Sequence, residues 1–438
     1  MPSKTPSFRL LALSAVFAAS SLIAAEPATL TLESALQSAE QINVNVLLGR
    51  ENVSQAQAQA GLARSGVLPT VDLSAEQRRT SSVTITNGIA AAGTPANRFD
   101  ANLTGSFDVL NPEQLSNLRS AKVGVEVADY DYRSSVQGAL ATVAQTYFTH
   151  LRNVHRIAVL DANVDLARQL LDLASNRLAS GVATQIDVTR AKSQLAQAQQ
   201  ARLQQDTVVY QSALQLRRLL NLDAAAPLQL ADFDVRRAAA TEFSATEERA
   251  AFAQRPDWLA AQKAVDRSKI DVRTARFERL PSLALAGQYG YSSADFDDGG
   301  KKAGWFAGAT VDLPVFDGLR SGSDRKLALS RQRAQELLLR DLELQIGAEI
   351  RLAVQDAGSR FQQIAVAETG QQLGEEELRL ARVRFDQGVA DNREVIEAQN
   401  TLALANDNLN EAIYQYNLSR LELARVRGDT RGILTEKQ

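Results

Sequence analysis

Residues 177–183 read Arg-Leu-Ala-Ser-Gly-Val-Ala, and residues 384–390 read Arg-Phe-Asp-Gln-Gly-Val-Ala, so one pattern occurs twice, 207 positions apart. The similarity continues without a gap beyond both motifs, in the pairs Val188 and Val395, Ala191 and Ala398, Leu195 and Leu402, and Ala198 and Ala405. Matches that persist at one fixed separation indicate an internal repeat.

A second pair of motifs sets the extent of the repeat. Ala-Arg-x-x-x-Leu-Pro occurs at 63–69 and again at 275–281, 212 positions apart and in the same order relative to the first motif. The sequence therefore predicts two copies of one unit, with the remaining residues divided into a connector between the units and a tail. We place the units at 26–223 and 242–428, the connector at 224–241 and the tail at 429–438.

Long helices dominate each unit. No proline occurs from Glu113 to Ser180 or from Leu319 to Gln387, and apolar residues recur there at three- and four-residue steps. At 1.5 Å per residue, such helices are ~100 Å long. Glycine ends them, because it adopts the left-handed conformation without strain. Each unit therefore ends in a long helical hairpin that turns at Gly181 or Gly388, at residues 113–221 and 319–427.

The returning helices, predicted over 185–220 and 392–427, have a coiled-coil register. In the second of them, large residues recur every seven positions, at Val395, Leu402, Leu409, Tyr416 and Leu423. A small residue follows most of them three positions later, at Ala398, Ala405, Ala412 and Ser419. This alternation of large and small residues is typical of helices that pack closely as a coiled coil.

Each unit also contains a predicted β-hairpin, at residues 69–110 and 281–316. It follows an opening helix that ends at the Leu-Pro pair, because proline cannot continue a helix. Apolar and polar residues alternate in all four strands, and polar segments, such as Ser81 to Asn97, form the loops. Strands of about ten residues with one apolar face are typical of a membrane β-barrel, although an ordinary soluble hairpin has the same pattern. Aromatic residues near the strand ends favour the barrel: Phe99, Phe107, Tyr291, Trp305 and Phe316.

The first 25 residues have the pattern of a secretory signal peptide. Lys4 and Arg9 precede the apolar run Leu10 to Ile23, and Ala24-Ala25 supplies small residues for cleavage. The run is shorter than the ~20 residues of a membrane-spanning helix. The chain has no cysteine, so it has neither a disulfide nor a cysteine for lipid attachment. We therefore expect an exported protein that is not lipidated.

Several functional classes are disfavoured by the sequence. No P-loop, Gly-x-Ser-x-Gly or Gly-x-Gly-x-x-Gly motif is present. The two histidines, His150 and His155, are five positions apart in a predicted helix, which is not the spacing of ligands on one face, so we interpret them as packed or solvated residues. The formal net charge of -3 leaves no basic excess for phosphates. We expect no enzyme activity, no metal or cofactor, and no nucleic-acid partner.

The number of strands predicts how the chain assembles. Four strands cannot close a barrel, and open strand edges in lipid cost several kcal/mol per unpaired group. Two copies would give eight strands, which side chains fill, whereas three copies give twelve strands and leave a lumen. The long helices of three copies would continue that lumen as a helical barrel. The sequence thus favours a mainly α fold whose helical hairpins form a trimeric α-barrel below a 12-stranded transmembrane β-barrel.

The two-fold repeat, the Ala-Arg-x-x-x-Leu-Pro motif and the Arg-x-x-x-Gly-Val-Ala turn together resemble the TolC family of outer-membrane efflux and secretion proteins. The resemblance covers nearly all of the chain after the signal peptide. It implies a homotrimer in outer-membrane lipid with a helical extension into the periplasm of a Gram-negative cell. It also implies two partners, a periplasmic adaptor and an inner-membrane transporter of the RND, ABC or MFS type. The chain would be the passive exit duct of an efflux pump or a type I secretion system, opened by the adaptor.

The resemblance further implies a gate at the periplasmic turns, where the adaptor would make contact with Gly181, Val182, Ala183, Thr184, Gly388, Val389, Ala390 and Asp391. Glu394 and Glu397 follow the second turn and share a helix face, because they are three residues apart. In a trimer they would form a ring of six carboxylates that favours cations. Alternatively, they only complement the dipole of the helix N-terminus.

Asp187 and Arg190 occupy the matching positions of the first unit. We expect them to form pairs between helices that hold the gate shut, unless they contact only water. A periplasmic coiled-coil adaptor or scaffold without a pore is the alternative function for the whole chain. Such an adaptor would have one helical hairpin rather than two, and conductance in a bilayer would distinguish the two functions.

Overall fold

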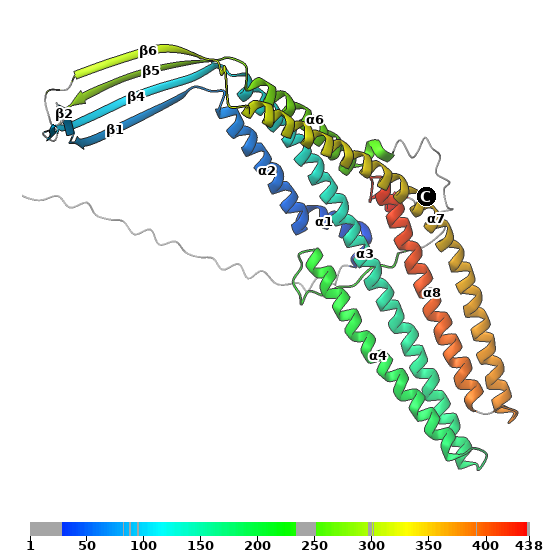
Figure 1. Ribbon diagram of the computed structural model, residues 1–438. Coiled ribbons are helices and arrows are strands. Elements are labelled where there is room, and N and C mark those ends of the chain that lie inside the picture. Colours follow the sequence, from blue (N-terminus) through cyan, green and yellow to red (C-terminus); the bar gives the residue numbers. More distant parts are fainter. Residues whose placement is uncertain are drawn as a thin grey trace, which may run out of the picture.

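The computed structural model describes residues 29–81, 83–86, 89–93, 96–233, 251–296, 300, 302–390 and 392–435. The predicted signal peptide, residues 1–25, lies outside these ranges, and so does Asp391 of the second predicted turn. Within them the molecule is elongated, with a four-stranded sheet at one end and the two helical turns at the other (Figure 1).

The described elements occur in the same order in both halves of the chain. The first half contains α1 (Leu32–Ile42), α2 (Val44–Ser65), β1 (Thr70–Thr80), β4 (Ala96–Leu110), α3 (Pro112–Ala179) and α4 (Gln185–Leu219). The second half contains α6 (Pro256–Phe277), β5 (Ser282–Ser293), β6 (Lys302–Asp312), α7 (Arg320–Asp386) and α8 (Asn392–Val426), followed by the short α9 (Gly432–Thr435). The bounds of the four long helices lie within one residue of those expected from the sequence.

Two elements differ from the sequence-based expectation. The opening segment of the first unit is two helices rather than one, because Asn43 interrupts it and its side chain accepts a hydrogen bond from Asn45 N at 2.9 Å, which caps α2. The polar segment after β1, expected as a loop, contains the short antiparallel strands β2 (Val83–Thr86) and β3 (Ile89–Ala92). Each of these strands has only 4 residues, which is too short for an alternating pattern to indicate a strand.

The four long strands form one antiparallel sheet in the order β1-β4-β5-β6, so β4 and β5 join the two repeats. Its register aligns side chains of one kind across the sheet. One apolar row consists of Leu73, Leu103, Tyr289 and Trp305, which pair in succession. All four are exposed in the single chain. The sheet therefore presents an apolar surface that this chain does not cover.

The helices pack as two antiparallel hairpins, α3 with α4 and α7 with α8, and α3 also contacts α2, α6 and α8. Near the turns, one apolar cluster includes Ala191, Phe385, Val395 and Ala398, so residues of both hairpins share a core. Most of the predicted large and small positions of α8 are thus buried against neighbouring helices, and Ala405 and Leu409 are half-buried. None of the described helices has the length and apolarity needed to cross a membrane.

A second apolar cluster lies where the connector meets the middle of α3. Leu30 and Leu230 form an isolated parallel bridge there, and Tyr147 of α3 donates its phenolic hydrogen bond to the Ala231 carbonyl at 2.5 Å. Burial, with a contribution from nearby Asp232, raises the pKa of Tyr147 to about 12, so the phenol remains a donor. The start of the described chain and the connector are therefore attached to the same helix.

Candidate functional site at the helical turns

The two turns have the same backbone structure. Gly181 and Gly388 both have φ of 74°, the left-handed region that glycine favours. In the first turn, Val182 N donates to Arg177 O at 2.9 Å and Gly181 N donates to Leu178 O at 3.0 Å. In the second, the equivalent bonds join Val389 to Arg384 at 3.0 Å and Gly388 to Phe385 at 3.0 Å. This pair of bonds is the Schellman arrangement that ends a helix at glycine.

Apolar side chains project from both turns into solvent. Val182 is 72% exposed and Val389, its equivalent, is 67% exposed. The remaining turn residues, Ala183 and Ala390, donate their backbone N–H groups back to the last turn of the preceding helix. At each tip, a hydrogen-bonded turn therefore presents an exposed valine. Each tip therefore exposes an apolar side chain to solvent.

In the first turn, Thr184 is the N-cap residue of α4 and Asp187, three residues later, closes a capping box with it. Its Oδ2 accepts hydrogen bonds from Thr184 N at 2.9 Å and from the Thr184 hydroxyl at 2.6 Å. These two bonds, and the charge of Arg190, hold the pKa of Asp187 below its usual value. Arg190 lies 4.0 Å from Asp187 on the same helix, and its side chain is 48% exposed. The structure thus brings Thr184, Asp187 and Arg190 together within one helical turn.

In the second turn, the two predicted carboxylates have different surroundings. Glu394 forms an ion pair with Arg384 at 2.7 Å, which joins the end of α7 to the start of α8. Glu397 is exposed one turn further along α8. Arg384 pairs with Glu394, whereas no described ion pair involves Glu397. Sequence spacing placed both residues on one face but did not identify the arginine that pairs with one of them.

The sequence also did not identify a contact between the two hairpins. Arg177, the equivalent of Arg384, has its guanidinium 4.0 Å from the ring centroid of Phe385 and donates a hydrogen bond to the Phe385 carbonyl. Phe385 is buried. Further from the turns, Gln194 of α4 donates to Asn400 of α8 at 2.9 Å. The only signal in the sequence was the aromatic residue at 385, where the first repeat has Leu178.

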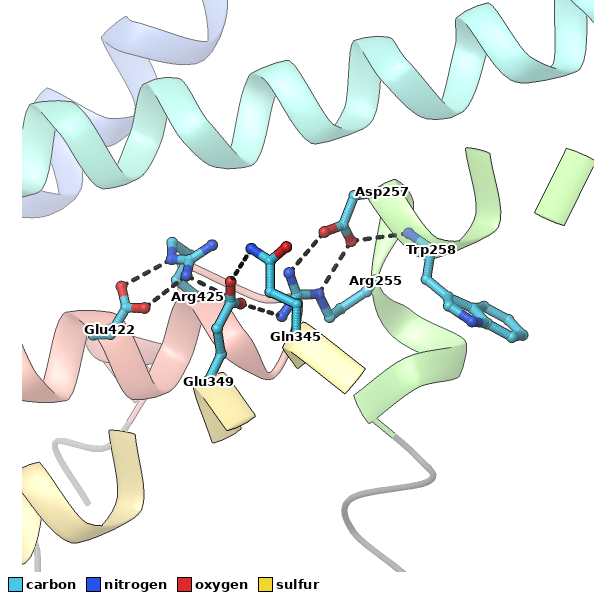
Figure 2. Close-up of polar contacts among 7 residues, drawn as sticks. All are labelled: Arg255, Asp257, Trp258, Gln345, Glu349, Glu422 and Arg425. Carbon is cyan, nitrogen blue, oxygen red and sulfur yellow. Dashed lines mark hydrogen bonds and ion pairs between the residues drawn. The ribbon is translucent and has the colours of Figure 1, made fainter. Parts of the chain in front are cut away.

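A network of charged groups joins the end of α8 opposite its turn to α7 and to the start of α6 (Figure 2). Arg255, which precedes α6, donates to Asp257 at 2.6 Å and to Glu349 of α7 at 2.9 Å. Arg425 of α8 donates to the same Glu349 at 3.3 Å and to Glu422 at 2.6 Å. The Arg255 side chain is only 5% exposed. This network connects α6, α7 and α8 at a distance from the turn of the second hairpin.

The two histidines do not form a site together. His150 is buried between α3 and α4, where its Nδ1 lies 2.8 Å from the Ser212 hydroxyl. Burial and the nearby charge of Arg217 lower the pKa of His150. His155 is partly exposed and lies 3.5 Å from Asp232. Among the described residues, no group of three or more His, Asp or Glu side chains is placed to hold a metal ion.

This chain is similar to outer-membrane channel proteins over most of its length. It is 23% identical to outer membrane protein TolC of Vibrio cholerae over an alignment of 377 residues. That alignment covers 84% of this chain and 83% of that protein. It is 25% identical to outer membrane protein OprJ of Pseudomonas aeruginosa over an alignment of 297 residues, and that alignment covers 66% of this chain and 61% of that protein. Its fold matches the CmeC outer membrane channel of Campylobacter jejuni with a TM-score of 0.81 at 22% identity, covering 92% of this chain and 88% of that one.

A family model described as outer membrane efflux protein matches residues 35–222 and 249–429. These two stretches coincide with the two structural repeats and are separated by the connector. The match is therefore to the repeated architecture as a whole and not to a single motif. The chain belongs to the outer membrane efflux protein family, the TolC-type channels of the outer membrane.

Proposed function

We propose that three copies of this chain form the exit duct of an efflux pump or a type I secretion system. The observation that carries the proposal is the four-stranded sheet. Its outer strands, β1 and β6, are both 11 residues long, and neither has a partner strand on its outer side among the described residues. The successive antiparallel pairings make β1 and β6 run in opposite directions, so β6 of one copy can pair antiparallel with β1 of the next.

The proposed barrel accounts for the exposed apolar surface of the sheet. Strand edges and an apolar face are both costly in water and are both covered in a closed barrel within lipid. Three copies supply twelve strands, enough for a lumen. The long helices below the sheet then extend the lumen into the periplasm as an α-barrel.

The helical turns are the proposed periplasmic gate and the site of adaptor contact. The exposed valines, Val182 and Val389, fit an apolar contact with a periplasmic adaptor at the two glycine turns. The stacking of Arg177 on Phe385 supports a closed arrangement in which the two hairpins of one chain are held together. Asp187 and Arg190 are proposed to add pairs between neighbouring helices. An inner-membrane transporter of the RND, ABC or MFS type would supply the energy.

Charges at the gate are proposed to favour cations. Three copies would place Glu394 and Glu397 in a ring of six carboxylates at the narrow end. The Arg384 charge offsets that of Glu394, so the net negative charge of the ring comes from Glu397. We therefore assign the selectivity of the closed end mainly to Glu397 and a structural role within the hairpin to Glu394.

The first test is the single-channel conductance of the purified mature protein in a planar bilayer, together with its mass in detergent. The proposal predicts a trimer mass and discrete, cation-selective conductance steps. A monomer or dimer without conductance would contradict it and favour a periplasmic scaffold.

A further inference from the structure

The four long helices lie in the order α4, α3, α8, α7, because α3 packs against both α4 and α8, and α8 packs against α7 (Figure 1). A helix of the first repeat therefore meets a helix of the second where α3 contacts α8, and we call this contact the inner seam. The helices at the two ends of the row, α4 and α7, are the repeat equivalents of α8 and α3, at a separation of 207 positions. The two sides of the inner seam thus occur a second time, on the end helices.

The inner seam is closed by apolar side chains and by hydrogen bonds from α8 to the backbone of α3. Leu166 and Leu173 of α3 are half-buried against an apolar cluster that includes residues of α8. The Gln399 side chain of α8 is buried and donates to the Leu166 carbonyl at 3.2 Å. Asn410, further along α8, donates to the Arg152 carbonyl at 3.1 Å. These contacts define which face of each helix belongs to the seam.

The corresponding face of α7 is uncovered in the single chain. Leu373, the equivalent of Leu166, is 65% exposed, and Leu380, the equivalent of Leu173, is 47% exposed. Exposure continues along the whole face, at three- and four-residue steps: Ser359, Gln363, Val366, Gly370, Leu373, Glu377, Leu380 and Arg384. A helix face with this many exposed apolar residues is typical of a surface that another molecule covers.

The face of α4 that corresponds to the seam side of α8 is uncovered as well. Leu203, the equivalent of Asn410, is 64% exposed, and Tyr210 is 61% exposed. Lys192 takes the place of Gln399 and is also exposed. The equivalent residues of α8 are all buried or half-buried, whereas each of these residues of α4 is exposed: Thr189, Lys192, Ala196, Gln199, Gln200, Leu203, Thr207 and Tyr210. The chain therefore has one half of a seam at each end of its row of helices.

Two half-seams at opposite ends of one chain can join only between copies, which is a head-to-tail contact that closes into a ring. We propose that α7 of one copy packs against α4 of the next copy in the way that α3 packs against α8. The inference rests on the proposed trimer and identifies its helical interface. Leu373 and Leu380 would be covered by α4 of the next copy, and the Lys192 ammonium group would donate to the Leu373 carbonyl, as Gln399 does to Leu166.

The charges explain why α8 and α4 do not exchange partners. In the inner seam, Arg152 pairs with Glu411 at 3.0 Å and Arg156 pairs with Asp407 at 2.9 Å. The positions 207 residues away from these four are all uncharged: Ser359, Gln363, Gln200 and Gln204. If α8 of another copy packed on α7, its two carboxylates would lose their arginines, and that loss disfavours the wrong pairing. The ion pairs therefore assign α8 to α3, and the uncharged positions leave α4 for α7.

The test is cysteine cross-linking in the mature protein, which has no native cysteine to give a background. The variant Lys192→Cys with Leu373→Cys is treated in detergent with a short bismaleimide, and denaturing gel electrophoresis separates single chains from joined ones. We expect three joined chains, in at least tenfold higher yield than for the control Lys192→Cys with Glu375→Cys. Glu375 is equally exposed but lies about 200° around α7 from Leu373. Neither Lys192→Cys nor Leu373→Cys alone should join chains.

A second pair and a calibration make the result decisive. Gln199→Cys with Val366→Cys lies two turns further from the tips in the same register and should also join three chains. Leu166→Cys with Gln399→Cys places the equivalent pair in the inner seam and should cross-link within one chain. If the calibration pair reacts and neither pair between copies exceeds the control in a protein with trimer mass and conductance, the inference is overturned and the proposed function stands. A monomer in detergent would overturn both.

Discussion

The two helical turns share one backbone, and their equivalent arginines make different contacts. Arg384 pairs with Glu394 inside the second hairpin at 2.7 Å. Arg177, 207 positions earlier, instead stacks on Phe385 of the other hairpin. The first hairpin has Asp187 where the second has Glu394. The Asp187 side chain is one methylene shorter and accepts hydrogen bonds from Thr184, the N-cap residue of its own helix. The two repeats therefore share the turn, but one arginine makes its contact within a hairpin and the other makes it between hairpins.

The same comparison applies at the start of the helices that lead to the sheet. Asn43 precedes α2 and Arg255, 212 positions later, precedes α6, and both side chains are buried. Asn43 donates to the Leu219 carbonyl at 2.9 Å, which is a bond between neutral groups. Arg255 instead contacts carboxylates on two elements (Figure 2). Equivalent positions thus anchor the two repeats with different chemistry.

The largest effect we predict comes from removing the charged anchor. Arg255→Met should lower the free energy of unfolding by about 3 kcal/mol, because it leaves Asp257 and Glu349 partly buried without their main cation. Asn43→Ala, the equivalent change in the first repeat, should cost about 1 kcal/mol, as is usual for the loss of a helix cap. Urea unfolding followed by far-ultraviolet circular dichroism measures both.

The response to pH sharpens this prediction. Burial opposes ionisation of Glu349, but hydrogen bonds from Arg255 and Gln345 and the charges of Arg255 and Arg425 outweigh it, so the pKa of Glu349 lies below its usual value. A carboxyl group with a lowered folded-state pKa stabilises the protein above its ordinary pKa and loses this contribution as pH falls through the folded value. The difference between wild type and Arg255→Met should therefore shrink in acid. If Arg255→Met and Asn43→Ala lowered the free energy of unfolding by equal amounts at every pH, the two positions would not differ in the way the comparison states.

The backbone was largely predictable from the sequence, and the contacts between repeats were not. The glycine turns, the helix ends near Ser180 and Gln387 and the alternation in the strands depend on neighbouring residues, so a local pattern reveals them. The stacking of Arg177 on Phe385 joins residues 208 positions apart, and it depends on how two hairpins lie in space. No local pattern marks such a contact. The short β2–β3 hairpin was missed because each strand has only 4 residues, which is too short for an alternating pattern to indicate a strand.

The second effect in size concerns the gate. Arg177→Ala removes both the stacking on Phe385 and the hydrogen bond to its carbonyl, worth about 1–2 kcal/mol, so the open channel should be populated roughly tenfold more often. Arg384→Ala removes an exposed pair within one hairpin and should change opening less than about twofold. Single-channel open probability in a planar bilayer is the measurement.

A conservative variant tests the geometry of that contact. Arg177→Lys keeps the charge but loses the planar group that stacks on the ring, so it should open the channel almost as often as Arg177→Ala. If Arg177→Ala and Arg384→Ala raised the open probability equally, the two arginines would have the same role. The distinction between a contact within a hairpin and a contact between hairpins would then fail.

The smallest effect we predict separates the two carboxylates after the second turn. Glu397→Gln removes a charge that no described ion pair offsets, so the preference for potassium over chloride should fall about two- to threefold, measured from the reversal potential in a salt gradient. The paired change Arg384→Gln with Glu394→Gln removes one positive and one negative charge and should leave the preference unchanged. Changing both members of the pair is necessary, because Glu394→Gln alone would also leave Arg384 as an added positive charge. An unchanged preference in Glu397→Gln would place that side chain outside the conducting path.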